Sequence, residues 1–334
     1  MTPYRAPRWL PGGHAQTIYG ALFTRCPKVE YRRTQWDTPD GDFIELDWVD
    51  GPAQAPLIVL FHGLEGSSRS HYALSLMDAV RARGWRGVVA HFRGCGGQPN
   101  RLARAYHSGD FPEVDWILER SAEAAGAAPH FAAGVSLGGN ALLKWLASEG
   151  AAAGRLLRAA GAVSAPVDLA VAGHGLGRGF NRVYTWHFLR SLKPKSLEKL
   201  SRYPGLYDGR KVAHARDLYQ FDGLVTAPLH GFESADDYWS RASSKPDLRH
   251  IALPTLLIHA RNDPFLPEAN LPRHDEVSPQ VTLEYFDTGG HAAFVTGPFP
   301  GRLEWLPNRL LAFFESHLPA VNGAPQRPAR ANVG

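Results

Sequence analysis

The chain has 334 residues, of which 44% are hydrophobic, so it is long enough to bury a large core. Its formal net charge of +4 comes from arginines spread along the chain and not from a basic run interleaved with aromatic residues, which argues against nucleic acid as a partner. Two cysteines, Cys26 and Cys95, are too few for a disulfide framework.

The first residues lack the apolar core of a secretory signal, and no apolar run is long enough to cross a bilayer. We therefore expect a cytoplasmic protein with free thiols and no integral membrane contact. Peripheral membrane contact stays open, because a weak positive field favours anionic surfaces but the sequence does not locate a patch. The sequence makes no prediction of the oligomeric state.

Eight segments have the composition of strands, and in the later part of the chain they alternate with helical stretches. Such alternation predicts an α/β fold with a mostly parallel central sheet covered by helices on both faces. The first two segments are joined by Thr38-Pro39-Asp40-Gly41 and should form an antiparallel hairpin at the edge. The eight segments are residues 29–36, 42–49, 56–61, 86–92, 130–135, 158–164, 254–260 and 281–286.

The third predicted strand runs into His62-Gly63-Leu64. A loop after an early strand is where a hydrolase of the Ser-acid-His type has a backbone N–H that binds a developing alkoxide, and Leu64 is the candidate donor. An ordinary strand-to-helix turn is the alternative interpretation. We interpret His62 as a packing or hydrogen-bonding residue.

Ser136 lies between a predicted strand and a predicted helix, in the run Gly134-Val135-Ser136-Leu137-Gly138-Gly139. The glycines two before and two after the serine leave room for a strained turn that exposes the hydroxyl next to a helix N-terminus. This pattern predicts a nucleophile at Ser136 and a second oxyanion donor at the Leu137 backbone N–H. A glycine-rich turn with an incidental serine is the alternative.

Residues 167–250 interrupt the alternation with helical and loop segments rich in aromatic side chains. We expect part of this aromatic set to line an apolar acyl pocket above Ser136, although packing of the insert onto the core would account for most of the rings. The set comprises Phe180, Tyr184, Trp186, Phe188, Tyr203, Tyr207, Tyr219, Phe221, Phe232, Tyr238 and Trp239.

The candidate acid and base follow the serine in the order that this type of site uses, each on a loop after a strand. Asp263 follows the strand segment 254–260, and Pro264 biases it away from helical geometry. His291 follows the strand segment 281–286 after a glycine pair. Asp168, beyond the strand segment 158–164, is a rival acid, because a carboxylate at that position can also reach the imidazole.

A serine hydroxyl is a poor nucleophile at neutral pH, so an imidazole has to take its proton during attack and return it to the leaving group. A carboxylate fixes the imidazole tautomer and stabilises its positive charge. Ser136, His291 and Asp263 supply these three groups. His259, within its strand, is interpreted as a structural residue.

Several blocks of the chain, together covering about residues 3–318, resemble an α/β-hydrolase of the bacterial YheT type, related to eukaryotic α/β-hydrolase-domain lipases and plant embryogenesis-associated proteins. Besides the serine and histidine motifs, the resemblance rests on the sequences WLPGGHAQT from Trp9, HFRGCGGQPNR from His91 and FDGLVTAPLHGF from Phe221. Gly96-Gly97 and Gln98 depart from the serine and glutamate that relatives often have there.

The resemblance implies an α/β-hydrolase fold with a helical cap inserted between core strands. In this organisation residues 1–166 and 251–318 form the hydrolase core and residues 167–250 form the cap. The last helix is expected at residues 303–317, and the composition of residues 319–334 predicts a disordered tail.

The resemblance also implies a serine hydrolase of carboxylic esters, with Ser136, Asp263 and His291 at the family's charge-relay positions. The expected substrate is a small ester with a short or medium apolar acyl group, and no metal or organic cofactor is expected. A thioesterase or an amidase would use the same three residues. A ligand-binding protein on a hydrolase scaffold is an alternative of a different class.

Overall fold

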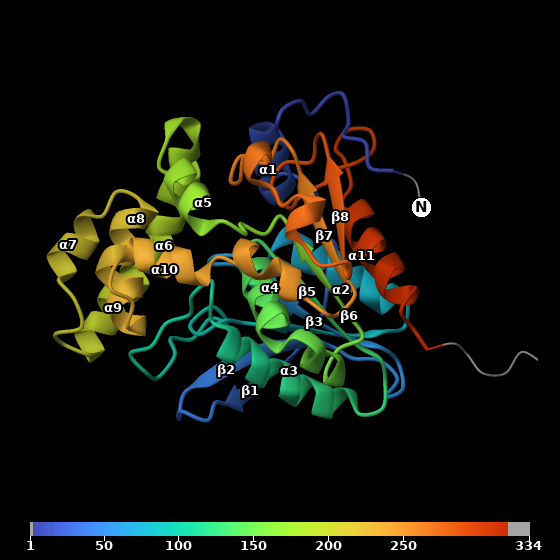
Figure 1. The fold of residues 1–334 in the computed structure, drawn as a ribbon, viewed down its shortest axis with the longest axis horizontal. Helices are drawn as coiled ribbons and strands as arrows, with labels where there is room; N and C mark the ends of the chain where they lie inside the picture. The colour runs from blue at the N-terminus through green and yellow to red at the C-terminus, as the bar shows by residue number, and fades with distance from the viewer. Residues whose placement is uncertain (1–2, 320–334) are drawn as a thin grey trace, which may run out of the picture.

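An eight-stranded mixed sheet runs through the computed structural model, which describes residues 3–319 (Figure 1). The order across the sheet is β1-β2-β4-β3-β5-β6-β7-β8, so the α/β fold predicted from the sequence is confirmed. The strands are β1 (Arg32–Asp37), β2 (Phe43–Val49), β3 (Leu57–Phe61), β4 (Arg86–Ala90), β5 (His130–Val135), β6 (Ala159–Val163), β7 (Thr255–Ala260) and β8 (Val281–Phe286).

The pair β1–β2 forms the predicted antiparallel hairpin at one edge of the sheet. Strand β2 is also antiparallel to β4, whereas all pairs from β4 to β8 are parallel. Strand β1 begins at Arg32, three residues later than predicted, because its pairing with β2 starts with Arg32 opposite Trp48 and does not include residues 29–31.

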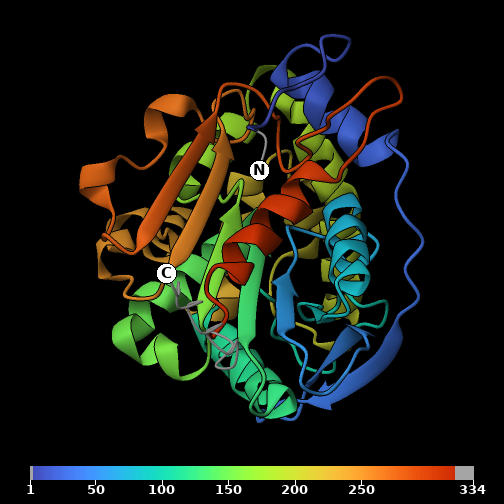
Figure 2. The ribbon, with the colours of Figure 1, turned by 90° about the vertical axis from the view of Figure 1, so that its right-hand side faces the viewer.

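Helices cover both faces of the sheet. Helices α3 (Phe111–Ala125) and α4 (Leu137–Glu149) pack on one face, and α2 (His71–Ala82) and α11 (Trp305–Glu315) pack on the other, which Figure 2 shows from the front. Successive strand residues point to opposite faces, so Ile58 joins the core beneath α2 and α11 while Val59 joins the core beneath α3 and α4.

A group of helices between β6 and β7 forms a lobe beside the sheet, at the left in Figure 1, and is called the cap below. The cap has an apolar cluster of its own, which includes Leu189, Phe221 and Trp239. Its helices are α5 (Leu169–Leu176), α6 (Arg182–Arg202), α7 (Gly209–His214), α8 (Leu218–Phe221), the π-helix η3 (Asp222–Thr226), α9 (Ala227–His230) and α10 (Ala235–Ala242).

Short 3-10 helices occur in several connections: η1 (Gly150–Arg155), η2 (Gly179–Asn181), η4 (Lys245–His250), η5 (Glu268–Asn270) and η6 (His274–Glu276). The N-terminal helix α1 (Gly13–Leu22) lies at the top of Figure 1 and contacts the loops that follow β7 and β8. Within residues 3–319, no helix has the length and apolarity needed to span a membrane. The predicted tail falls almost entirely on residues 320–334, which lie outside the described part of the chain.

Because β3, β5, β7 and β8 run in the same direction, their carboxyl ends meet at one edge of the sheet. The loops that follow these strands carry the candidate site residues, and open α/β sheets bind ligands at this edge.

Candidate active site

Ser136 occupies the single-residue junction between β5 and α4. Its φ of 54° and ψ of −124° are unusual for a residue with a side chain. The turn is held by a bond from the Ser136 N–H to the Val163 carbonyl at 2.9 Å, and the Ser136 carbonyl accepts from Asn140 N–H at 3.1 Å. A strained residue that is fixed in this way exposes its hydroxyl at the start of a helix.

Two glycines around Ser136 allow the backbone to approach closely. A Cβ atom on Gly134 would lie 2.5 Å from the Gly138 carbonyl oxygen, and one on Gly138 would lie 2.4 Å from the Phe61 carbonyl oxygen. Neither distance is compatible with a side chain, since both contacts are with backbone atoms. The spacing of glycines at two before and two after the serine is therefore required by packing, as the sequence predicted.

The structure brings Ser136, His291 and Asp263 together into one chain of hydrogen bonds. His291 Nε2 lies 2.9 Å from Ser136 Oγ, and His291 Nδ1 lies 2.9 Å from Asp263 Oδ2. Ser136 precedes Asp263 and His291 by more than one hundred positions in sequence, yet all three residues follow carboxyl ends of parallel strands. An N–H on Nδ1 would leave Nε2 free to accept the serine proton.

Asp263 is fully buried and receives contacts on both carboxylate oxygens. Oδ1 accepts from the Phe265 backbone N–H at 2.8 Å, and Oδ2 lies 3.2 Å from His259 Nε2 as well as next to His291. Burial would raise the pKa of the Asp263 carboxyl, but the two imidazoles and their hydrogen bonds outweigh it and hold the pKa well below its usual range. Asp263 is therefore ionised at neutral pH.

His259 was predicted to be structural, and its buried ring contacts the acid directly. Phe265 supplies a second contact that the sequence did not indicate. Its ring stacks on the His291 imidazole with centroids 3.9 Å apart and planes 25° apart. His291 is thus held between an aromatic face and a carboxylate.

The rival acid Asp168 does not contact His291. Its carboxylate accepts from the Val171 N–H at 3.1 Å and caps the N-terminus of α5. This is the ordinary role of an aspartate that precedes a helix.

Two polar residues of α1 fix the turn that carries His291. The His291 N–H donates to Thr17 Oγ1 at 2.8 Å, and the Gly289 N–H donates to Gln16 Oε1 at 2.8 Å. Gln16 Oε1 also accepts from Asn262 Nδ2 at 3.0 Å, so one buried amide joins the acid loop to the base loop. The sequence motif that starts at Trp9 contains both residues, but the motif was assigned no role from the sequence. Polar residues on a short helix were the one sequence feature that could have indicated these contacts.

Gly63, Leu64 and Glu65 lie on the loop after β3, and the backbone N–H groups of the first and the third donate hydrogen bonds to tyrosine hydroxyls. The Gly63 N–H donates to the Tyr72 hydroxyl and the Glu65 N–H donates to the Tyr106 hydroxyl, both at 2.9 Å. Within residues 3–319, the Leu64 and Leu137 N–H groups have no acceptor. The loop lies against the serine, because a Cβ on Gly63 would be 3.1 Å from Ser136 Cβ. Two free donors beside Ser136 can bind an oxyanion.

His62 is buried beneath this loop. Its Nε2 accepts from the Phe92 N–H at 3.0 Å, and its Nδ1 lies 2.8 Å from the Gly63 carbonyl oxygen. Burial lowers the pKa of the imidazole to about 3, so the ring is neutral and structural, as expected from the sequence.

A cavity of about 280 Å³ opens beside Ser136 between the core and the cap. Most of its lining is apolar, and the cap supplies Leu169, Leu176, Phe188, Leu192, Phe221 and Trp239. Of the aromatic residues that were singled out in the sequence, Phe188, Tyr207, Phe221, Tyr238 and Trp239 line the cavity. The expectation that part of the set faces an apolar pocket is met, and an apolar chain fits this lining.

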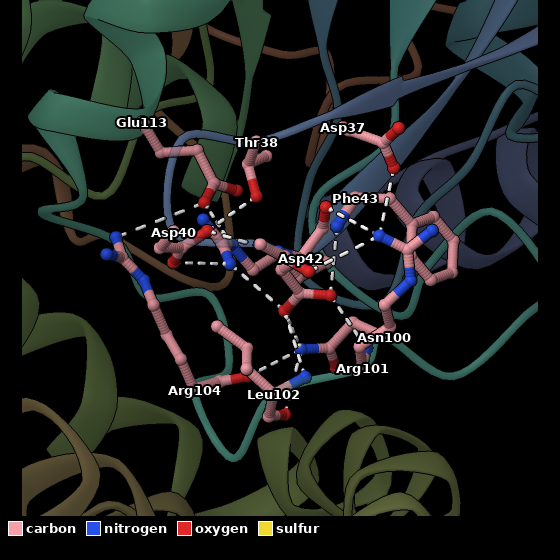
Figure 3. Close-up of polar contacts among 12 residues, drawn as sticks. Asp37, Thr38, Asp40, Asp42, Phe43, Asn100, Arg101, Leu102, Arg104 and Glu113 are labelled. Carbon is pink, nitrogen blue, oxygen red and sulfur yellow. Dashed lines mark hydrogen bonds and ion pairs between the residues drawn. The ribbon is translucent and has the colours of Figure 1, made fainter.

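A buried polar network fixes the loop 93–104, which forms one wall of the cavity (Figure 3). Asp42 accepts from Asn100 Nδ2 and from the Arg101 N–H, both at 2.6 Å. Burial would raise the pKa of Asp42, but these hydrogen bonds outweigh it and the pKa is lowered. Asn100 Oδ1 in turn accepts from Lys199 Nζ at 2.7 Å, which ties the loop to α6.

No three histidine, cysteine, aspartate or glutamate side chains within residues 3–319 are grouped so that they could hold a metal ion. The polar groups gathered around Ser136 are its hydroxyl, an imidazole hydrogen-bonded to a carboxylate, and two backbone N–H groups without an acceptor in the described part of the chain, an arrangement that is chemically capable of acyl transfer.

Comparisons with known proteins identify the family and the fold of the chain. Residues 56–298 match the family model of the α/β hydrolase fold. The chain is 41% identical to "Putative esterase YheT" of Escherichia coli K12 over 312 residues, which cover 92% of this chain and 91% of that protein. It is 27% identical to human phospholipase ABHD3 over 318 residues, covering 92% of this chain and 77% of that protein.

Among solved structures, esterase Pf2001 of Pyrococcus furiosus superposes with a TM-score of 0.56 at 16% identity, covering 88% of this chain and all of that chain. At this identity the likeness concerns the fold. The fold, the matched model and the 41% identity together lead to one conclusion: the chain belongs to the α/β-hydrolase family and is related to the proteins named YheT and ABHD3.

Proposed function

We propose that the protein is a serine hydrolase that cleaves carboxylic esters with an apolar acyl group. In this proposal Ser136 is the nucleophile, His291 the general base and Asp263 the acid that orients it, and the N–H groups of Leu64 and Leu137 bind the oxyanion. The observation that carries the proposal is the unbroken hydrogen-bond chain from Asp263 through His291 to Ser136, at the side of an apolar cavity.

In the first step Ser136 Oγ attacks the ester carbonyl carbon while His291 Nε2 takes the hydroxyl proton. The carbonyl oxygen becomes an alkoxide, and the two backbone N–H groups stabilise it. The ionised Asp263 stabilises the imidazolium that forms. His291 then gives its proton to the leaving alcohol, and the acyl group remains bonded to Ser136.

In the second step water replaces the alcohol. His291 takes a proton from the water, whose oxygen attacks the acyl carbon, and the collapse of the second tetrahedral intermediate releases the acid and restores the Ser136 hydroxyl. Neither step requires a metal or an organic cofactor.

The test is hydrolysis of p-nitrophenyl esters of graded acyl length by the purified protein and by Ser136→Ala. We expect turnover to fall by about 10⁴- to 10⁶-fold in the variant with no change in thermal stability. An unchanged rate in Ser136→Ala would overturn the assignment. Matched thioester and amide substrates in the same assay decide whether the bond that is cleaved is an oxygen ester.

Labelling by a fluorophosphonate separates an enzyme from a binding protein on the same scaffold. An activated serine reacts with the probe, so wild-type protein should be labelled at Ser136 and Ser136→Ala should not be labelled. Absence of labelling in the wild-type protein would favour the binding protein.

A further inference from the structure

The N-terminal half of α6 has two faces with different surroundings. Tyr184 and Phe188 point inward, since the Tyr184 ring lies 4.9 Å from that of Phe265 and Phe188 lines the cavity. Val183 and Trp186, on the opposite side of the helix, are 46% and 60% exposed. Phe180 in the adjoining η2 is 54% exposed. One side of this segment thus faces the cavity, and the other side exposes apolar side chains to solvent.

The exposed side chains are surrounded by positive charge that has no negative partner. Within residues 3–319, the side chains of Arg178, Arg182, Arg190 and Arg216 form no ion pair, and the Arg190 guanidinium lies 4.9 Å above the Trp186 ring. A shallow hollow here is lined by arginines, Lys193 and apolar side chains and by no aspartate or glutamate. We call Phe180, Val183 and Trp186 with these four arginines and Lys193 the outer face of α6.

Elsewhere within residues 3–319, three exposed arginines have carboxylate partners, unlike the four arginines of this face. Arg32, Arg81 and Arg273 are all more than half exposed, and each pairs with an aspartate at 2.6 to 3.0 Å. The outer face of α6 therefore differs from these positions in combining unpaired cations with exposed aromatic rings.

We propose that the outer face of α6 is a docking surface for an anionic lipid bilayer. Tryptophan and phenylalanine insert at the boundary between headgroups and acyl chains, and neighbouring arginines bind the anionic headgroups while their stems remain in apolar surroundings. A second copy of the chain fits this surface poorly, because a symmetric dimer would bring like charges face to face. The proposal concerns binding alone and does not depend on hydrolysis by Ser136.

Docking in this way would place the cavity near the bilayer. The Phe180 ring lies 4.6 Å from that of His14 on α1, the helix whose Thr17 holds His291. Helix α6 itself separates the outer face from the cavity lining.

The test is co-sedimentation of the full chain with vesicles of phosphatidylcholine alone and of phosphatidylcholine with about one third phosphatidylglycerol. The triple variant Arg182→Gln, Arg190→Gln, Arg216→Gln removes three unpaired charges. The matched control Arg32→Gln, Arg81→Gln, Arg273→Gln removes three paired charges of similar exposure. Hydrolysis of p-nitrophenyl acetate and thermal stability report whether each variant is folded.

We expect the wild-type protein and the control to bind the anionic vesicles and to bind neutral vesicles weakly, with binding to the anionic vesicles falling as salt rises. The outer-face variant should bind anionic vesicles about 100-fold more weakly, and Trp186→Ala should also bind them more weakly. Equal binding by the two triple variants, or no preference for anionic vesicles, overturns the proposal. A dimer in solution that only the outer-face variant abolishes, without vesicle binding, assigns the surface to a second copy and overturns it too.

Ser136→Ala separates this proposal from the proposed function. Vesicle binding by Ser136→Ala should equal that of the wild-type protein. If the protein proves not to hydrolyse esters, the vesicle result still stands, and if the vesicles are not bound, the assignment of Ser136 is unaffected.

Discussion

Lys195 Nζ on the cap helix α6 lies 2.8 Å from Glu65 Oε2 on the loop that follows β3. Glu65 has a φ of 55° and directly follows Leu64, one of the two proposed oxyanion donors. Its side chain is only 7% exposed, and Oε1 accepts from the Tyr106 hydroxyl at 2.8 Å. The cap is thus connected to the oxyanion loop through an ion pair with one buried partner.

Lys195→Met should lower kcat for ester hydrolysis by about 5- to 20-fold, with a smaller change in KM, because the strained loop loses the group that holds its carboxylate and Leu64 shifts relative to the oxyanion. Steady-state kinetics on a soluble p-nitrophenyl ester measure both constants. Lys195→Arg, which keeps the charge, should recover most of the rate. Lys193→Met, on the outward side of the same helix, is the control and should behave as wild type. An equal loss of kcat in Lys195→Met and Lys195→Arg would contradict the role that we assign to the positive charge.

Asp222 is a carboxylate in the cavity wall, and its partners are neutral donors. Thr226 Oγ1 donates to it at 2.7 Å and Trp239 Nε1 at 2.8 Å. Burial raises the pKa of the Asp222 carboxyl to about 6, and the two hydrogen bonds only partly oppose the rise. The group is therefore ionised at pH 8 and largely neutral at pH 5.

Asp222→Asn should raise kcat/KM for a medium-chain ester at pH 8 by about 2- to 5-fold, since an ionised carboxylate beside an apolar chain is unfavourable. The advantage over the wild-type protein should vanish as pH falls through about 6, where the wild-type carboxyl becomes neutral. Measuring both proteins from pH 5 to 8 and taking the ratio of kcat/KM cancels the titration of the common catalytic groups. A ratio that does not change with pH would contradict this account.

Five histidines that are buried or half-buried should make folding sensitive to acid. Burial lowers their pKa values to about 3 or 4, whereas an unfolded histidine has a pKa of about 6.5. Below pH 6.5 the unfolded chain binds more protons than the folded chain, so the free energy of unfolding is highest above that pH and falls as pH drops towards 4. The five are His62, His71, His107, His130 and His230.

His130 allows a single-residue test of this effect, because the hydrogen-bond partners of its ring within residues 3–319 are two uncharged groups, Ser121 Oγ and the Leu156 carbonyl oxygen. In urea unfolding between pH 4.5 and 6, His130→Gln should flatten the dependence of the unfolding free energy on pH by about 1.4 kcal/mol per pH unit. The exposed His187→Gln is the control and should leave the slope unchanged. Equal slopes in His130→Gln and wild type would refute the assignment of a neutral buried ring.

Much of the fold could be predicted because its signals are local. Strand composition and turn residues gave the eight strands, and the edge hairpin followed from a four-residue turn. Ser136 was identifiable because the glycines at 134 and 138 are required by backbone contacts within one turn. Strand ends shifted by up to three residues, since pairing with a neighbour and not the segment itself fixes where a strand begins.

The contacts around Ser136, Asp263 and His291 were harder to predict, because the residues that make them lie far away along the chain. Gln16 contacts the loop at Gly289 across 273 positions, and no nearby residue signals that its amide will join two loops. The sequence likewise did not indicate that Phe265 contacts His291 or that Lys195 contacts Glu65. Each of these contacts exists only after α1 and the cap have packed over the sheet edge.

By itself the sequence determined which kinds of chemical group stand after which strands, because turn geometry and strand composition depend on neighbouring residues. Only the tertiary structure shows which of the two candidate carboxylates, Asp168 or Asp263, contacts the imidazole of His291. The Asp168 carboxylate accepts from the Val171 N–H at the start of α5, whereas Asp263 follows β7, which pairs with β8, and its carboxylate contacts the imidazole of His291. Strand order in the sheet sets that meeting, and strand order is a property of long-range packing that no local segment encodes.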